Sequence, residues 1–246
     1  MPTFFVAADA VTPPFIHITG PLLQHLRQSL RLHPGDALTV TDGQGMRYRT
    51  TVTDVTAQQI TGQILDTQQS PPRTAPSLVL ALALLKGEKM DWAIQKATEL
   101  GIDRIVPVYA AHSVVKLQPD RADHQLSRWQ RIALEAAQQS ERWTIPAIET
   151  PATLPELFAR YAVCGSKNIL AERSSGPSLH TIPLPVDPKQ TVIIVIGPEG
   201  GWSLEELQLA QKQGYRDISL GKRILRAETA AIAAISILQS RLGELG

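Results

Sequence analysis

Residues 191–207 read TVIIVIGPEGGWSLEEL, a stretch that predicts a strand, a tight loop and a helix in immediate succession. Thr191 to Ile196 are six β-rich residues typical of a buried strand. Gly197 to Gly201 contain three glycines and a proline, so this backbone can turn tightly and approach a ligand closely. Ser203 and Glu206 have capping-box spacing at the start of the helix. Open α/β sheets bind ligands at the carboxyl ends of such strands.

A second loop near the C-terminus carries the charge that the first loop lacks. Residues 220–230 read LGKRILRAETA and follow a predicted strand, just where the final helix is predicted to begin. The two loops together predict a pocket in which backbone groups hold a small molecule. Arg223, Arg226 and Glu228 are the side chains expected to face the chemistry.

The segment TQQSPPRTAP, Thr67 to Pro76, predicts a linker between two domains because it is polar, contains three prolines and has no apolar periodicity. Before it, short β-branched runs and the turn at residues 42–45 predict a small β-barrel over residues 1–72. One helix over Pro21 to Leu32 interrupts this barrel, with an apolar face at Leu22, Leu23, Leu26 and Leu30.

After the linker, strands and helices alternate over residues 76–246. This alternation predicts an α/β domain with a mostly parallel sheet and helices on both faces. Strands are expected at 78–85, 104–109, 168–171, 191–196 and 216–220, and helices at 88–100, 120–141, from Thr153, from Ser203 to Gly214, and at 227–242.

Composition narrows the class of protein. The 24 basic and 23 acidic residues give a formal charge of +1, so any RNA binding would have to use local patches. The single cysteine, Cys164, cannot form an internal disulfide, and no apolar stretch reaches membrane-spanning length. The N-terminal residues lack the basic and apolar regions of a signal peptide. We therefore expect a cytoplasmic protein without a membrane partner.

Several common active-site signatures do not occur in the sequence. The loop at Gly197 is not followed by Gly-Lys-Ser/Thr and is not the GxGxxG of a dinucleotide fold. The six histidines are scattered without ligand spacing, so we expect no metal site. Neither a Gly-x-Ser-x-Gly elbow nor a Cys/His pairing supports nucleophilic hydrolysis. These exclusions narrow the chemistry without naming it.

Four stretches carry a resemblance to a known family. They are IGPEGGWSLEEL at 196–207, SLGKRILRAETAAIAA at 219–234, LKGEKMDWAIQKATELGIDRIVPV at 85–108 and HLRQSLRLHPGDALTVTDGQG at 25–45. Together they closely resemble the bacterial 16S rRNA uracil-N3 methyltransferase family over nearly the whole chain. The resemblance implies a PUA-like barrel at residues 1–72 and a SPOUT-type α/β trefoil-knot methyltransferase domain at 76–246. It further implies a homodimer that methylates N3 of one uridine in the decoding region of 16S rRNA, within the small ribosomal subunit.

The same resemblance places S-adenosylmethionine among three loops that form the knot, at 170–173, 196–201 and 220–225. Glycine at positions 197, 200 and 221 would then be needed because a side chain would occupy the cofactor's volume. The residues expected to bind the cofactor are Leu170, Ala171, Glu172, Ile196, Gly197, Pro198, Glu199, Gly200, Gly201, Leu220, Gly221, Ile224 and Leu225.

The chemistry of uridine suggests roles for the charged residues. Loss of the N3 proton puts negative charge on N3, O2 and O4, which a guanidinium can stabilise. We hypothesise that Arg226 does this, with Arg223 next in order, and that Glu228 is the base, with Glu199 or solvent as alternatives.

Basic residues in both domains are candidates for RNA contact. Arg27 and Arg31 are expected to share one face of the first helix, at i, i+4 spacing. Lys86 and Lys89 flank a glycine turn after a predicted strand, where they could bind phosphates.

Two positions depart from the family pattern. Thr3 stands where an arginine is common before Phe-Phe-Val, which puts one possible RNA contact in doubt, and Glu141 stands where a glycine is usual. Two other functions stay open at this point. One is a SPOUT enzyme that methylates a ribose 2′-oxygen or another base, and the other is a noncatalytic RNA-binding ribosome assembly factor.

Overall fold

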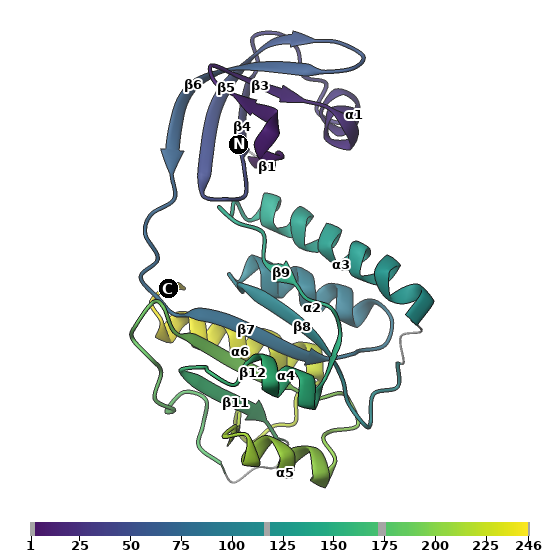
Figure 1. The fold of residues 1–246 in the computed structure, drawn as a ribbon, viewed down its shortest axis with the longest axis vertical. Coiled ribbons are helices and arrows are strands. Elements are labelled where there is room, and N and C mark those ends of the chain that lie inside the picture. Colours follow the sequence, from purple (N-terminus) through teal and green to yellow (C-terminus); the bar gives the residue numbers. More distant parts are fainter. Residues whose placement is uncertain (1–2, 116–118, 172–175, 246) are drawn as a thin grey trace. The chain divides into compact units, whose positions relative to one another are not determined.

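The computed structural model describes residues 3–115, 119–171 and 176–245, which form two compact units (Figure 1). Unit 1 comprises Met1–Pro72 with Ala137–Ile145, and unit 2 comprises Arg73–Ala136 with Pro146–Gly246. The chain therefore passes between the units three times. Within the described ranges, no helix is long and apolar enough to cross a membrane. No cluster of three or more metal-binding side chains occurs there either.

Unit 1 is built on a curled half-barrel sheet of six strands, in the order β1-β4-β5-β6-β3-β2. The predicted turn at residues 42–45 joins β4 to β5, which pair antiparallel, as predicted. Buried side chains, among them Phe4, Ile16 and Val40, fill the inside of this sheet. The strands are β1 (Thr3–Phe5), β2 (Val11–Thr12), β3 (Phe15–Ile18), β4 (Ala37–Thr41), β5 (Met46–Val55) and β6 (Ile60–Gln69), with helices η1 (Ala8–Ala10) and α1 (Gly20–Gln28).

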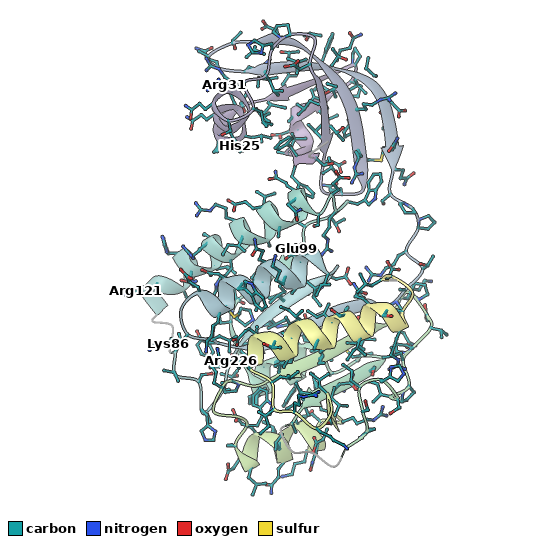
Figure 2. All side chains as sticks on the ribbon, turned by 180° about the vertical axis from the view of Figure 1, so that it is seen from behind. His25, Arg31, Lys86, Glu99, Arg121 and Arg226 are labelled. Carbon is teal, nitrogen blue, oxygen red and sulfur yellow. The ribbon has the colours of Figure 1, made fainter. Side chains whose placement is uncertain are left out.

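Helix α1 is shorter than predicted. It ends at Gln28, and Arg31 lies beyond the helix in a left-handed conformation with φ 50° (Figure 2). The backbone N–H of Leu32 bonds to the carbonyl of Leu26, so Leu32 rather than Leu30 packs on the core. Leu30 is 43% exposed. The prediction that Arg27 and Arg31 share one helix face is therefore wrong.

The predicted linker contains the boundary between the units, after Pro72, but both of its ends are held by the units themselves. Strand β6 continues to Gln69 because Met46 to Tyr48 of β5 pair with Thr67 to Gln69, and backbone pairing needs no apolar side chains. Further along, Arg73 forms an ion pair with Asp103 at 2.6 Å and donates to the carbonyls of Ala75 and Pro76. The part of the segment from Arg73 onward is therefore fastened to unit 2.

Unit 2 contains a seven-stranded sheet whose path is β10-β8-β7-β12-β11-β13, with β9 beside β8. Every pairing between its described strands is parallel, which confirms the predicted α/β class. The strands are β7 (Ser77–Ala83), β8 (Arg104–Tyr109), β9 (Ala147–Ile148), β10 (Ala152–Thr153), β11 (Ser166–Leu170), β12 (Thr191–Ile196) and β13 (Arg216–Ile218). The helices are α2 (Glu88–Glu99), α3 (Pro119–Gln139), α4 (Leu154–Arg160), α5 (Leu204–Lys212) and α6 (Ala227–Arg241).

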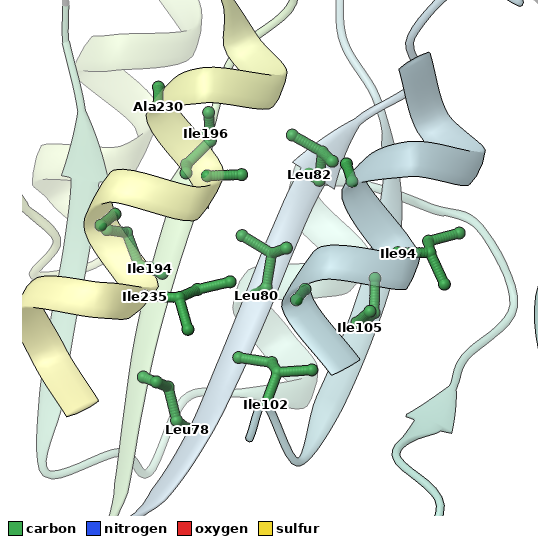
Figure 3. Packing of buried hydrophobic residues seen from close by; sticks show 14 of the residues in the cluster. Leu78, Leu80, Leu82, Ile94, Ile102, Ile105, Ile194, Ile196, Ala230 and Ile235 are labelled. Carbon is green, nitrogen blue, oxygen red and sulfur yellow. The ribbon is translucent and has the colours of Figure 1, made fainter. Parts of the chain in front are cut away.

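Helices cover both faces of this sheet, as predicted. On one face, α2 and α6 pack over β7, β8 and β12 through residues such as Leu80, Ile94 and Ile235 (Figure 3). On the other face, α4 and α5 contribute Leu157, Phe158 and Ala210. The run at residues 78–83 is buried on both faces, which explains why it is continuously apolar. Ile235 and Leu238 of the final helix, α6, belong to the internal core.

The two departures from the family pattern have structural explanations. Thr3 is buried in β1, with only 2% of its surface exposed. Glu141 has φ 52°, the left-handed conformation that follows many helices and favours glycine. The N–H of Arg142 bonds to the carbonyl of Ala137, which closes the helix end. Position 141 thus has the backbone conformation that favours glycine, although its residue is a glutamate.

Arg47 stabilises the segment after this helix end. Its guanidinium lies 4.0 Å from the ring centroid of Trp143 and donates a hydrogen bond of 2.8 Å to the carbonyl of Glu141. Thr41 also donates, at 3.5 Å, to the carbonyl of Trp143. These contacts explain why residues 137–145 belong to unit 1.

Glu141→Gly should stabilise the protein. A non-glycine residue in the left-handed region costs roughly 1–2 kcal/mol, and the freer unfolded chain offsets about 0.4–1 kcal/mol of the relief. We expect a net gain of about 0.5–1 kcal/mol in the free energy of unfolding, measured by urea denaturation. Glu135→Gly, at an exposed position inside α3, is the control and should lose about 1 kcal/mol. A loss in both variants would contradict the explanation for Glu141.

Candidate functional site

Three loops at the carboxyl ends of neighbouring strands enclose a cavity in unit 2. The strands are β12, β11 and β13, and the first turn of α6 closes the remaining side. The cavity has a volume of about 630 Å³, within the range of roughly 300–1,000 Å³ typical of small-molecule sites. Parallel strands bring all their carboxyl ends to one edge, so these loops meet although they are far apart in sequence.

Most of the residues predicted for the cofactor and the chemistry line this cavity. They are Leu170, Ala171, Ile196, Gly197, Pro198, Glu199, Gly201, Leu220, Gly221, Arg223, Ile224, Leu225 and Arg226. Gly200 and Glu228 are not among the lining residues, and Glu172 lies outside the described residues. The cavity therefore combines the two loops that the sequence singled out with the end of β11.

Trp202, a residue of the protein itself, leaves little room for a side chain at position 197. A Cβ atom at position 197 would lie 3.0 Å from two atoms of the Trp202 indole. The indole N–H donates a 3.0 Å hydrogen bond to the carbonyl of Leu170, at the end of β11. The ring thus fastens the β12 loop to β11, and this close packing is a second reason for glycine at position 197 beside the predicted space for a cofactor.

Gly200 is also packed against the protein. A Cβ there would lie 2.9 Å from Cβ of His112, whose ring bonds at 3.2 Å to the carbonyl of Gly201. Nearby, the Glu206 carboxylate accepts a hydrogen bond from the N–H of Ala111. The loop after β8 thus supports the glycine loop from outside the cavity. Of the three glycines at positions 197, 200 and 221, only Gly221 has no atom within 4 Å of an added Cβ, and its φ of +116° itself favours glycine.

The charges around the cavity are mostly positive. Lys222, Arg223 and Arg226 line it and are exposed, and their side chains make no hydrogen bond or ion pair with any described residue. Arg226 is the N-cap residue of α6, so the helix fixes its backbone (Figure 2). The unpaired guanidinium groups of Arg223 and Arg226 can bind phosphate or stabilise a developing anion.

Glu199 is the only acid among the described lining residues. Lys89 donates a 2.7 Å hydrogen bond to its carboxylate. Burial raises the pKa of the Glu199 carboxyl, but the hydrogen bond and charge of Lys89 outweigh burial, so the pKa is below its ordinary value. A carboxylate of this kind takes up a proton less readily, which weakens Glu199 as a candidate base.

Glu228 lies in the first turn of α6, outside the lining. It is half-buried, and its Oε2 atom is buried without a hydrogen-bond partner among the described residues. A buried carboxylate oxygen without a partner is costly in a folded protein and is often retained for function. Glu228 therefore stays a candidate base by its chemistry.

The sequence missed several lining residues. Trp202 is one of them, and a tryptophan directly after a glycine loop is the sequence signal that could have indicated packing on that loop. Ser178, Ser219 and Ala230 carry no sequence signal, because they reach the cavity only through the tertiary fold.

Comparison with protein families gives two matches. A family described as "RNA methyltransferase domain" matches residues 73–239, and one described as "RNA methyltransferase PUA domain" matches residues 18–65. A "Ribosomal RNA small subunit methyltransferase E" of Synechocystis is 32% identical over 96% of this chain and 77% of its own length. The Bacillus subtilis protein of the same name is 30% identical over 92% of this chain and 90% of its own.

Solved structures of similar proteins superpose on almost the whole chain. One from Neisseria gonorrhoeae, a ribosomal RNA small subunit methyltransferase E bound to S-adenosyl methionine, has a TM-score of 0.87, 29% identity and 98% coverage of both chains. A methyltransferase structure from Legionella pneumophila with bound SAM has a TM-score of 0.87, 30% identity and 97% coverage of both. Since the family matches and the full-length relatives agree, the chain belongs to the ribosomal RNA small subunit methyltransferase E family.

Proposed function

We propose that this protein transfers a methyl group from S-adenosylmethionine to N3 of a uridine in the decoding region of 16S rRNA. The observation that carries the proposal is the cavity at the ends of β11, β12 and β13, with unpaired arginines beside apolar walls. A cytoplasmic location is part of the proposal, because the substrate is ribosomal.

The cavity residues fit S-adenosylmethionine, which two solved relatives bind. Leu170, Leu220 and Leu225 offer apolar surface for an adenine ring, and the glycine loop offers backbone groups for hydrogen bonds. We assign cofactor binding to the lining residues of the three loops, together with Glu172 from the sequence prediction. When bound, the cofactor supplies an activated methyl group on a sulfonium.

Given such a methyl donor, the protein must orient the uridine and stabilise its N3 anion. We assign the second task to Arg226, because its guanidinium is exposed at the cavity and has no competing partner among the described residues. Arg223 is the next candidate. For the base we propose Glu228 or solvent ahead of Glu199, whose carboxylate Lys89 already occupies.

Four basic residues are predicted to contact RNA, and they differ in whether their side chains already have partners in the protein. Lys86 is exposed and has no partner among the described residues, so it is available to a phosphate. Arg27 is exposed and donates a long hydrogen bond, 3.4 Å, to the carbonyl of Ala57. Arg31 is exposed beyond α1. We keep these three as RNA contacts, whereas Lys89 is engaged with Glu199.

The proposed reaction predicts 3-methyluridine in small subunits from a strain lacking the enzyme, after incubation with this protein and S-adenosylmethionine. Nucleoside mass spectrometry identifies the product, and naked 16S rRNA provides the comparison for substrate form. A 2′-O-methyl nucleoside or another methylated base would replace the proposal by the corresponding activity. Absence of both methylation and cofactor binding in calorimetry would favour the noncatalytic assembly factor.

Two substitutions should separate cofactor binding from turnover. Gly197→Ala overpacks against Trp202 and should weaken cofactor binding by roughly tenfold or more. Arg226→Ala should leave cofactor affinity nearly unchanged and lower methyl transfer by about 10²–10³-fold. Calorimetry measures the first quantity and single-turnover methylation the second.

Gly214→Ala and Arg216→Ala are the matched controls for this pair. Both residues lie in unit 2 outside the cavity lining. An added Cβ at position 214 would meet no atom within 4 Å, and the left-handed φ of +79° there makes alanine cost stability away from the cavity. Neither control should change cofactor affinity or turnover by more than about twofold. Near-normal turnover in Arg226→Ala would remove Arg226 from the mechanism.

We also propose that the protein is a homodimer, as the family resemblance implies. Ile224, in the loop beside Arg226, is 58% exposed and could be covered by a second subunit. Sedimentation velocity at micromolar concentration should then show a dimer, and Ile224→Asp should shift the population toward monomer. A wild-type protein that sediments only as a monomer would contradict this proposal.

A further inference from the structure

Lys89 lies at a position where a lysine is unfavourable for its own helix. Helix α2 begins at Glu88 after the N-cap Gly87, so Lys89 is in the first turn. The unpaired N–H groups of a first turn make that end of the helix positive, which favours acids and disfavours lysine. Lys89 therefore needs another explanation than helix stability.

The partner of Lys89 belongs to a different loop. Its Nζ lies 2.7 Å from Oε1 of Glu199, and the side chains of Lys89 and Glu199 are 38% and 28% exposed. Lys89 follows β7 and Glu199 follows β12, and these strands are neighbours in the sheet. The ion pair therefore connects two adjacent loops at the carboxyl edge.

Two other contacts hold the glycine loop, Gly197 to Gly201, one near each of its ends. Trp202 packs on Gly197 and bonds to the end of β11, while His112 packs on Gly200 and bonds to Gly201. Pro198 and Glu199 lie between these glycines, and of the two only Glu199 has a side chain that can form an ion pair. Lys89 thus supplies the third attachment, from the side of α2.

Lys86 provides a contrast within the same turn. It is exposed and has no partner among the described residues, whereas Lys89 is half-buried and paired. The two lysines were predicted to share one role, but their surroundings differ.

We infer that Lys89 is a positioning residue of the cofactor cavity, where it holds Glu199 and thereby fixes Pro198 to Gly201 in the shape that receives the cofactor. This inference rests on the proposed function for the identity of the ligand. Lys89 acts through Glu199 and touches neither RNA nor the reacting atoms. Because the loop is held before the ligand arrives, less conformational entropy is lost on binding.

The test compares Lys89→Met, Lys89→Arg and a matched control, Lys96→Met. Lys96 is on the same helix and pairs with Glu99 at the same distance of 2.7 Å, with exposures of 34% and 27%. That pair lies within α2 and outside the cavity lining. The control thus removes an equivalent ion pair without touching the glycine loop.

The first measurement uses the protein without cofactor, by hydrogen–deuterium exchange of the peptide covering residues 197–203. Lys89→Met should speed exchange of the Gly201 amide, which bonds to the carbonyl of Pro198 at 3.0 Å. Lys96→Met should leave this peptide unchanged. Equal exchange in wild type and Lys89→Met would overturn the inference, independently of any ligand.

The second measurement is the affinity for S-adenosylmethionine, by calorimetry. Lys89→Met should weaken binding by about three- to fivefold, and Lys89→Arg should restore most of it. In a double-mutant cycle, adding Glu199→Gln to Lys89→Met should cost little more than either change alone. Fully additive effects would overturn the inference. If wild type failed to bind the cofactor at all, the proposed function would fail while the exchange result still stood.

The third measurement distinguishes positioning from RNA contact. Lys89→Met should leave the salt dependence of 16S rRNA affinity unchanged, because a residue that neutralises no phosphate releases no counterion. A reduced salt slope in Lys89→Met would assign Lys89 to the RNA surface and overturn the inference.

Discussion

The packing of the Trp202 indole on Gly197 is the constraint on which the rest of the site depends. A Cβ atom at position 197 would lie only 3.0 Å from two atoms of the ring, and the indole N–H reaches the last carbonyl of β11. One side chain thus ties the loop after β12 to the end of its neighbouring strand. The cavity keeps its wall because this contact leaves the loop few alternatives.

The two loops that line the cavity differ in charge: the loop after β13 carries unpaired cations, and the glycine loop after β12 carries a paired acid. The loop after β13 carries three cationic side chains without partners among the described residues, those of Lys222, Arg223 and Arg226. They suit the proposed substrate in two ways: the uridine becomes an anion when N3 loses its proton, and the rRNA around it is a polyanion. The glycine loop carries Glu199, whose charge Lys89 neutralises. The unpaired cations are thus available to the substrate, whereas the Lys89–Glu199 ion pair joins two loops of the protein.

Local sequence signals predicted most elements because each element satisfied its own physical requirements. Strand β12 was predicted with its observed bounds, since six β-rich residues between polar neighbours leave little choice. The capping box at Ser203 also forms as predicted, and the helix expected from Thr153 begins with a second one, because both hydrogen bonds of such a box lie within one helical turn. The errors lie where distant contacts decide: Gln69 remains in a strand through its partner Met46, and Arg31 leaves the helix so that Leu32 can pack.

The sequence by itself determined the α/β class, the two loops at strand ends and the side chains that could carry chemistry, since period, glycine content and charge are local properties. Tertiary structure alone decided what each loop residue does. Trp202 and His112 lie close against Gly197 and Gly200, and Lys89 differs from Lys86 because only Lys89 pairs with Glu199. The Lys89–Glu199 pair joins residues 110 positions apart, and only the sheet order that makes β7 and β12 neighbours brings them together.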